Sequence, residues 1–211
     1  MASVAKYTDT ASDNIIRHIE RTIQTPSNKN IDSERSHLNY NLHSTNRDGK
    51  IFLSSKNYFE HRKKEVHYLK RADVKTLCGW VITLPKDIPP NEHKAFFTAC
   101  HSYLISLYGE ENIVSSVCHL DEETPHLHCL FLPIVRDKKK GGEKVCAKEV
   151  LTRQHLREFH PALEKHLQEH GISTKILSGI TASQGGNRTV KELKKERLKI
   201  HSHERGVFIG R

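Results

Sequence analysis

Residues 114–133, VSSVCHLDEETPHLHCLFLP, constrain the fold of this chain more than any other stretch. Two apolar runs, Val114–Cys118 and Leu127–Leu132, are rich in residues that favour β-strands, and a short polar loop separates them. This pattern predicts a β-hairpin. We place the remaining elements of the chain around that hairpin.

Three histidines lie where the predicted strands meet the loop: His119, His126 and His128. His126 and His128 are two residues apart, so on a strand their side chains lie on the same face. If His119 ends the first strand opposite His126, the Cβ atoms of this pair are about 4.5–5.5 Å apart. The three imidazoles then converge on one point. Three neutral ligands leave coordination positions open, which favours a catalytic metal over a structural one.

Two acidic residues of the hairpin loop, Asp121 and Glu122, lie close to the predicted metal in sequence. Each can serve as a fourth ligand, as an acceptor that holds an imidazole N–H, or as a base. The sequence leaves all three roles open. The alternative without a metal is an ordinary hairpin with surface or core histidines, but the third histidine and the adjacent acids favour the metal.

Composition favours one main domain and a polyanionic partner. The chain has 211 residues, and 34 Lys and Arg against 25 Asp and Glu give a net charge of +9. Such a balance indicates nucleic acid first and an acidic membrane surface second. No apolar run reaches about 18 residues and no signal-peptide pattern occurs, so we expect a cytoplasmic protein. The five cysteines are scattered without a C-x-x-C motif, which argues against a disulfide framework.

Strand-like and helix-like segments alternate along the chain and predict an α+β domain with a mainly antiparallel sheet. The expected strands are Ser3–Tyr7, Ser36–His43, Leu77–Leu84, the two hairpin strands, Lys144–Ala147 and Ile172–Leu177, and the expected helices start near Thr10 or Ser12, Lys56, Asn91 and Thr152. We expect the domain to cover residues 1–181. Residues 182–211 form a basic charged helix or tail that links to a further C-terminal region.

The first predicted helix carries a histidine and an arginine on one flank. Its apolar stripe is formed by isoleucines, and His18 and Arg21 lie three residues apart beside that stripe. At this spacing an imidazole and a guanidinium can face one ligand together. A solvated helix face is the alternative for this segment taken alone.

Three motifs in their order and spacing resemble the MobV (Mob/Pre) family of plasmid mobilisation relaxases. They are the H-x-x-R of His18 to Arg21, the SHLNYNL of Ser36 to Leu42, and the HLDEETPHLH of His119 to His128. The likeness covers nearly all of residues 1 to about 195. One position departs from the family: the second motif usually reads N-Y-[D/E]-L, and here Asn41 stands in place of the acid.

The resemblance implies an HUH-type endonuclease fold, a five-stranded antiparallel sheet with helices packed on one face and DNA on the other. Members nick one strand of supercoiled plasmid DNA at an origin of transfer with Mn²⁺ or Mg²⁺, and stay attached to the 5′ end. The metal ligands would be His119, His126 and His128. The nucleophile would be His18 rather than a tyrosine.

The resemblance also assigns roles to further residues. Arg21 would add a second cation beside the nucleophile, and Glu122 would lie close to the metal. Tyr40 and Tyr108 match tyrosines that contact DNA, and we expect Asn39 to do so beside Tyr40. The expected partners are single-stranded and hairpin DNA of an origin of transfer, the conjugation coupling apparatus, and a second copy of the chain in a dimer formed through a C-terminal extension.

Other functions fit parts of this pattern. A hydrolytic nuclease would use the same metal with water as the nucleophile and Glu122 or Asp121 as the base. A rolling-circle replication initiator would share the HUH site. A DNA-binding module would use the metal only to hold the hairpin. If His18 is not the nucleophile, Tyr7 or Tyr40 would be the next candidate.

Overall fold

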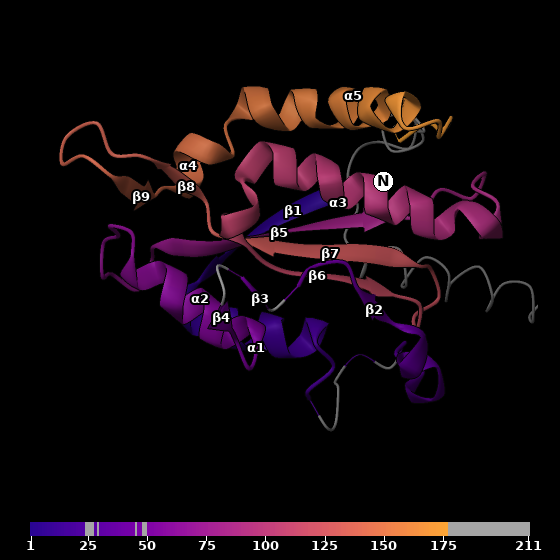
Figure 1. The fold of residues 1–211 in the computed structure, drawn as a ribbon, viewed down its shortest axis with the longest axis horizontal. Coiled ribbons are helices and arrows are strands. Elements are labelled where there is room, and N and C mark those ends of the chain that lie inside the picture. The colour runs from indigo at the N-terminus through magenta and orange to yellow at the C-terminus, as the bar shows by residue number, and fades with distance from the viewer. Residues whose placement is uncertain (24–27, 29, 45, 48–49, 177–211) are drawn as a thin grey trace, which may run out of the picture. The chain divides into compact units, whose positions relative to one another are not determined.

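A five-stranded antiparallel sheet forms the centre of the computed structural model, which describes residues 1–23, 28, 30–44, 46–47 and 50–176 (Figure 1). The strand order is β1-β5-β7-β6-β2. The strands are β1 (Ala2–Thr8), β2 (Tyr40–Asn41), β5 (Lys75–Thr83), β6 (Ile113–His119) and β7 (His126–Phe131). The predicted α+β class, the antiparallel sheet and its five strands are confirmed.

The predicted hairpin forms with the expected register. β6 and β7 pair so that His119 lies opposite His126 and Val117 lies opposite His128. Because side chains alternate between the two faces of a strand, these four residues share one face of the sheet. The residues between them, such as Leu127, lie on the other face.

Helices cover both faces of this sheet (Figure 1). One face packs against α3 (His93–Tyr108), α4 (Ala147–Val150) and α5 (Arg153–Glu169), and the other packs against α1 (Asp9–Ile19) and α2 (Ser55–Lys64). The prediction that helices pack on one face only is therefore wrong. The reason is that Ile16 and Ile19 of α1 and Phe59 of α2 form apolar stripes, which are buried against the strands beneath them.

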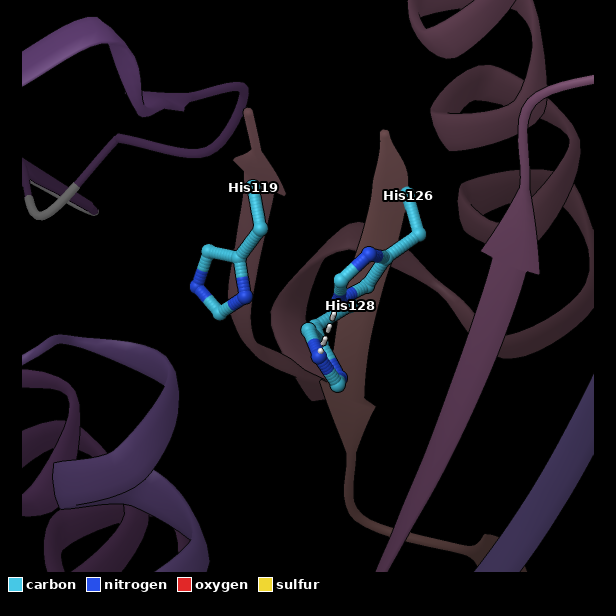
Figure 2. Close-up of side chains that lie close together, drawn as sticks. All are labelled: His119, His126 and His128. Atoms are coloured by element: carbon cyan, nitrogen blue, oxygen red, sulfur yellow. Dashed lines mark hydrogen bonds between the residues drawn. The ribbon is translucent and has the colours of Figure 1, made fainter. Parts of the chain in front are cut away.

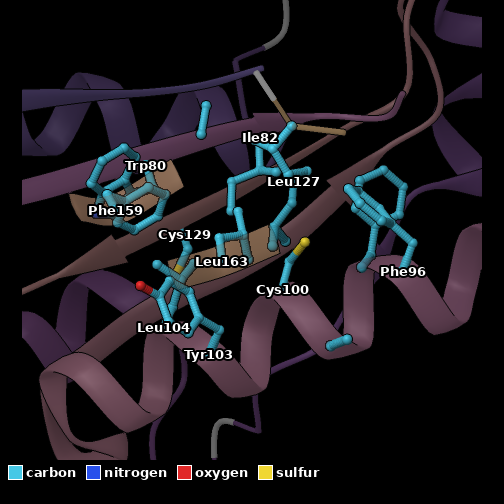
Figure 3. Close-up of a cluster of buried hydrophobic side chains, with 14 of the residues drawn as sticks. Trp80, Ile82, Phe96, Cys100, Tyr103, Leu104, Leu127, Cys129, Phe159 and Leu163 are labelled. Carbon is cyan, nitrogen blue, oxygen red and sulfur yellow. The ribbon is translucent and has the colours of Figure 1, made fainter. Parts of the chain in front are cut away.

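The larger core lies between the sheet and the pair α3 and α5 (Figure 3). Trp80 of β5 stacks on Phe159 of α5 with ring centroids 3.5 Å apart, and Tyr108 stacks on Phe131 at 3.8 Å. The Trp80 indole N–H donates to the Tyr108 hydroxyl over 2.8 Å. A buried indole thus finds the acceptor that burial requires.

Two predicted strands differ in the structure. In place of a strand over Ser36–His43, a 3₁₀ helix η1 (Ser33–Leu38) precedes the short β2, because the Asp32 carboxylate accepts from the Glu34 N–H and caps the turn. Tyr40 and Leu42 pack against the larger core, whereas Leu38 is exposed. Over Ile172–Leu177 the described residues 172–176 form no strand, and two isoleucines there are buried in that core.

The remaining elements lie outside the main sheet. They are β3 (Asn46–Arg47) with β4 (Lys50–Ile51), β8 (Ile134–Arg136) with β9 (Glu143–Val145), and the 3₁₀ helices η2 (Pro90–Glu92) and η3 (Glu110–Asn112). The expected strand near Lys144 is therefore β9, in a separate two-stranded sheet. The charged C-terminal helix and the boundary predicted after residue 181 lie outside the described residues. Among the helices that the structure describes, none is both long and apolar enough to cross a membrane.

Candidate metal centre

The three hairpin histidines lie together at the end of β6 and β7 where the loop 120–125 connects the two strands (Figure 2). One ring nitrogen from each of His119, His126 and His128 lies within 4.8 Å of the others. The Nε2 atoms of His126 and His128 are 3.0 Å apart. Two imidazole nitrogens that each lie about 2.0–2.2 Å from one ion at a right angle would be separated by about this distance.

The protonation state of the buried histidines favours metal binding at this site. Burial lowers the pKa of His119 to about 4, and it lowers the pKa of His128 well below the ordinary value. Neighbouring positive charge from Arg21 acts in the same direction for both rings. Both rings are therefore neutral at neutral pH, which is the form that binds a metal. The donor set of three neutral imidazoles fits a divalent transition-metal ion.

Both ring nitrogens of His119 tie it to the end of α1. Its Nε2 donates to the Ile19 carbonyl oxygen over 2.8 Å, and its Nδ1 lies 3.0 Å from Nη2 of Arg21. These contacts fix the orientation of the ring, and binding of a metal by His119 would require one of the two nitrogens to be released from its contact. Helix α1 is thereby coupled directly to the centre.

His18 lies in the last turn of α1 and faces the same cluster. Its ring centroid is 6.1 Å from that of His128 and 6.3 Å from that of His119, and both contacts are edge-to-face. Burial, followed by the positive charge of Arg21, lowers the pKa of His18. The structure thus brings the histidine of the first motif to the three histidines of the third as a neutral imidazole.

Arg21 links the end of α1 to the hairpin loop. Its Nε and Nη2 donate to the two Asp121 oxygens over 2.8 and 2.7 Å, and Nη2 also donates to Glu122 over 2.8 Å. Its Nη1 caps α1 by donating to the His18 carbonyl oxygen over 2.9 Å. Arg21 has a φ of 54°, a conformation that costs a non-glycine residue on the order of 1 kcal/mol and that these contacts hold in place.

Asp121 is the buried anchor of this network. Its side chain is fully buried, and it accepts from Ser36 Oγ over 2.8 Å as well as from Arg21. Burial alone would raise the pKa of Asp121, but the hydrogen bonds from Arg21 and Ser36 outweigh it and hold the pKa well below the usual range. A carboxylate held in this way is a structural anion and a poor base.

Glu122 also has partners on both carboxylate oxygens. Oε1 accepts from Arg21, and Oε2 accepts from the Asn28 side-chain amide over 3.2 Å. The expected proximity of Glu122 to the centre is observed, since one ligand atom each from His119, Asp121 and Glu122 lies within 4.8 Å of the others.

The residues expected to contact DNA lie in three different environments. Tyr108 is buried in the larger core, where its hydroxyl also lies 2.9 Å from His155 Nε2, and this position gives no support to a DNA contact. Tyr40 packs against the same core, on the face opposite the histidines, and burial raises its pKa. Asn39 uses its side-chain oxygen to accept from the Leu120 N–H over 2.7 Å, which fastens the segment before β2 to the hairpin loop.

The sequence did not indicate one residue of the site, Ser36, or one contact within it, the pair of Arg21 and Asp121. Ser36 was assigned only to a strand, and its bond to Asp121 depends on the turn of η1. The bidentate pair of Arg21 and Asp121 joins residues 100 apart, which no local spacing predicts. The one available signal was that both residues belong to motifs that also hold site histidines.

Comparison with solved structures shows that the sheet and its histidine hairpin have the architecture of a relaxase domain. The structure of the MobM relaxase domain (MOBV; Mob_Pre), bound to plasmid pMV158 oriT DNA and Mn, matches with a TM-score of 0.71 and 29% identity. That match covers 93% of this chain and 97% of the MobM chain.

The family follows from the sequence as well. The model of the plasmid recombination enzyme (Mob_Pre) family matches residues 1–195, so the chain belongs to this family. It is 32% identical over 209 residues to a plasmid recombination enzyme of Lactiplantibacillus plantarum, covering 96% of this chain and 55% of that protein. It is 32% identical over 184 residues to one of Streptococcus agalactiae, covering 85% of this chain and 35% of that protein. The chain thus spans between about a third and just over half of these relatives.

Proposed function

We propose that this chain is a metal-dependent relaxase domain that nicks one strand of plasmid DNA at an origin of transfer and holds the 5′ end covalently on His18. The observation that carries the proposal is the position of His18, whose ring faces two of the three clustered histidines at 6.1 and 6.3 Å between centroids. The DNA and Mn in the matching MobM structure support oriT DNA as substrate and Mn²⁺, with Mg²⁺ as the alternative, as cofactor.

The residues of the chain divide the reaction between them. When bound by His119, His126 and His128, the divalent ion offsets negative charge on the scissile phosphate. The neutral imidazole of His18 attacks phosphorus with its unprotonated nitrogen and the bond to the 3′ oxygen breaks. This oxygen takes up a proton from water, and the other ring nitrogen of His18 releases its proton to water. The new phosphorus–nitrogen bond retains the energy of the broken ester for later rejoining.

Arg21 acts as a positioning residue in this proposal. Its guanidinium is held by Asp121 and Glu122, and its side chain is only 14% exposed. It therefore fixes the last turn of α1, and with it His18, against the hairpin loop. The added cation that we expected beside His18 is largely neutralised by the two carboxylates.

The carboxylate geometry argues against the hydrolytic alternative. Water activation needs a carboxylate with a free oxygen and a pKa near the working pH. Asp121 is buried with a lowered pKa, and both oxygens of Glu122 accept hydrogen bonds from Arg21 and Asn28. A transesterification through His18 requires neither residue as a base for water.

A nicking assay tests the proposal. The chain is incubated with Mn²⁺ and a supercoiled plasmid that carries the origin of transfer of its own plasmid, and the products are separated under denaturing conditions. We expect an open circle with protein on the 5′ end. The adduct should be labile in acid and stable in base, because a phosphoramidate hydrolyses in acid and a phosphotyrosine does not.

The matched variants separate the nucleophile from other histidines. His18→Ala should remove both nicking and adduct, and His170→Ala, an exposed histidine at the end of α5, should retain both. Free 5′ ends without adduct would indicate the hydrolytic nuclease. Full adduct formation by His18→Ala would exclude His18 as the nucleophile.

Three further expectations stay predictions. They are the contact with the conjugation coupling apparatus, the dimer through a C-terminal extension, and the cytoplasmic location. Each concerns the longer proteins of which this chain spans only part, and none enters the proposed reaction.

A further inference from the structure

An open groove of ≈ 450 Å³ lies beside the metal centre. It is bordered by the end of α1, the segment between η1 and β2, β2 itself, and residues 53–54. Arg21 and Asn39, which belong to the network of the centre, form part of its wall. The volume falls within the range of small-molecule sites and can hold one nucleotide.

The strand register places Asn41 on the histidine side of this groove. Asn41 pairs with Val117 of β6, and Val117 pairs with His128 of β7. The three residues form one row across the sheet, so their side chains lie on the same face. With strands about 4.8 Å apart, Asn41 lies about 10 Å from His128 along that row.

The same register places the Tyr40 side chain on the other face of the sheet from Asn41. Tyr40 pairs with Cys118 in the adjacent row, and its ring packs against the larger core on the opposite face. Asn41 is the β2 residue whose side chain is exposed, and its amide has no hydrogen-bond partner among the residues that the structure describes.

An apolar side chain lies in the wall of the same groove. Leu53 is 93% exposed, which is unusual for a large hydrophobic residue beside a polar site. A nucleobase offers an apolar face and a polar edge, so Leu53 and the Asn41 amide together match one unpaired base.

We propose that Asn41 reads the base of one unpaired nucleotide next to the scissile phosphate. This inference rests on the proposed function and adds the residue that selects the sequence at the nick. An asparagine amide offers a donor and an acceptor side by side, which pair with the N6 and N7 atoms of adenine. A carboxylate can only accept, and it pairs with the N4 amino group of cytosine.

The test reads binding and therefore does not depend on nicking. The whole 211-residue chain with His18→Ala selects strands from a randomised single-stranded DNA library in the presence of Mn²⁺, and the bound strands are sequenced. The selection is repeated after adding Asn41→Asp, Asn41→Ala or, as a matched control, Asn91→Asp. Asn91 is exposed in η2, outside the residues that border the groove, and its change to Asp adds the same single negative charge.

We expect one position of the selected sequence to prefer adenine by roughly 5- to 100-fold, the range that a bidentate amide contact gives. Asn41→Asp should change that position to cytosine and leave the others unchanged. Asn41→Ala should remove the preference there, and Asn91→Asp should only lower the overall affinity.

Three outcomes would overturn the inference. These are identical base profiles in the parent and Asn41→Asp, a profile that Asn91→Asp alters in the same way, or a parent with no base preference at any position. Loss of adduct in the nicking assay would instead refute the proposed function. The two failures are therefore distinguishable.

Discussion

Adjacent residues of β7 face opposite sides of the sheet and contact entirely different groups. His126 and His128 lie in the polar centre beside α1, whereas Leu127 and Cys129 are fully buried in the apolar core beside α3. On the α3 side, stabilisation comes from burial and ring stacking, which depend on area and fit. On the α1 side it comes from charge-assisted hydrogen bonds, which depend on each partner.

Alternate residues of β7 therefore have different roles. Leu127 and Cys129 stabilise the fold, whereas His126 and His128 belong to the polar centre. The apolar face can lose a methyl group without changing what the polar face binds. The polar face can lose a ligand without opening the core. Variants at neighbouring positions should therefore give opposite phenotypes.

The largest expected effect separates His126 from Leu127. His126→Ala removes a metal ligand, so nicking should fall roughly 1,000-fold or more, since the metal supplies several kcal/mol of transition-state stabilisation. Without metal, the free energy of unfolding of this variant should differ from that of the parent by less than about 1 kcal/mol. Leu127→Ala should lower that free energy by about 2–5 kcal/mol and retain Mn²⁺ binding and nicking at low temperature. Urea unfolding and calorimetric Mn²⁺ titration measure the two quantities.

The result that would contradict the comparison is a coupled phenotype. If Leu127→Ala lost Mn²⁺ affinity in proportion to its loss of stability, the two faces would not be independent. If His126→Ala bound Mn²⁺ as the parent does, the metal would have other ligands.

The next effect concerns pH. His119 has a pKa of about 4 when folded, because it is buried, and an ordinary value of 6.5 when unfolded. Between these values the unfolded chain binds more protons, so the metal-free protein should lose stability as the pH falls from 6.5 to about 4, on the order of 3 kcal/mol from this residue. Below about pH 4 His119 is protonated in both the folded and the unfolded chain, so it causes no further loss of stability. Urea unfolding at pH 7 and at pH 4.5 measures the loss.

A variant assigns that loss to the residue. His119→Gln cannot take up a proton, so its difference between the two pH values should be smaller than that of the parent by most of this amount. Other histidines with lowered pKa values remain in the variant: His18 and His128 at the centre, and the half-buried His155, His160 and His166 of α5. An unchanged pH dependence in His119→Gln would show that those residues cause all of it.

A smaller effect compares a buried ion pair with an exposed one. Asp121→Asn removes the charge that holds Arg21 but keeps an acceptor for Ser36, and it should cost about 2 kcal/mol of folding free energy. It should also lower nicking, because the last turn of α1 is no longer fixed. The control is Asp13→Asn, whose partner Lys56 is half exposed, and it should cost markedly less because solvent screens this pair.

If both substitutions cost the same, burial of the Arg21–Asp121 pair would not increase its contribution. Rescue offers a second check. In the background of Asp121→Asn, the further change Arg21→Met should cost less than it does in the parent, because the arginine has already lost its main partner.

The cluster of three histidines could be predicted because all three lie within ten residues of one hairpin. Local alternation and a short loop are enough to bring such residues together. The Arg21–Asp121 pair could not be predicted, since its geometry depends on how α1 lies against the sheet. That packing is set by apolar stripes far apart in the chain, and these stripes also place α1 and α2 on the face that we expected to be free of helices.

The expected DNA contacts show the limit of carrying roles over by motif. Tyr108 was assigned by its match to a family tyrosine, but its position in α3 puts the ring into the core, where Phe131 and Trp80 contact it. Nothing in the local sequence distinguishes an outward from an inward tyrosine on a helix that is apolar on most sides. For β2, the alternation of the sequence already placed Tyr40 inward and Asn41 outward, and only the register with β6 shows which face that is.

The smallest expected effect tests the two alternative nucleophiles, Tyr7 and Tyr40. Tyr7 pairs with Leu77, which lies four residues before Val81, the partner of His128, so the Tyr7 backbone is about 13 Å along the sheet from the nearest histidine row. Tyr40 lies on the opposite face of the sheet. Tyr7→Phe and Tyr40→Phe should each change the rate of adduct formation less than about twofold, because His18 is the nucleophile in the proposed reaction. A loss comparable to that of His18→Ala in either variant would move the nucleophile to that tyrosine, and the acid stability of the remaining adduct would identify the bond.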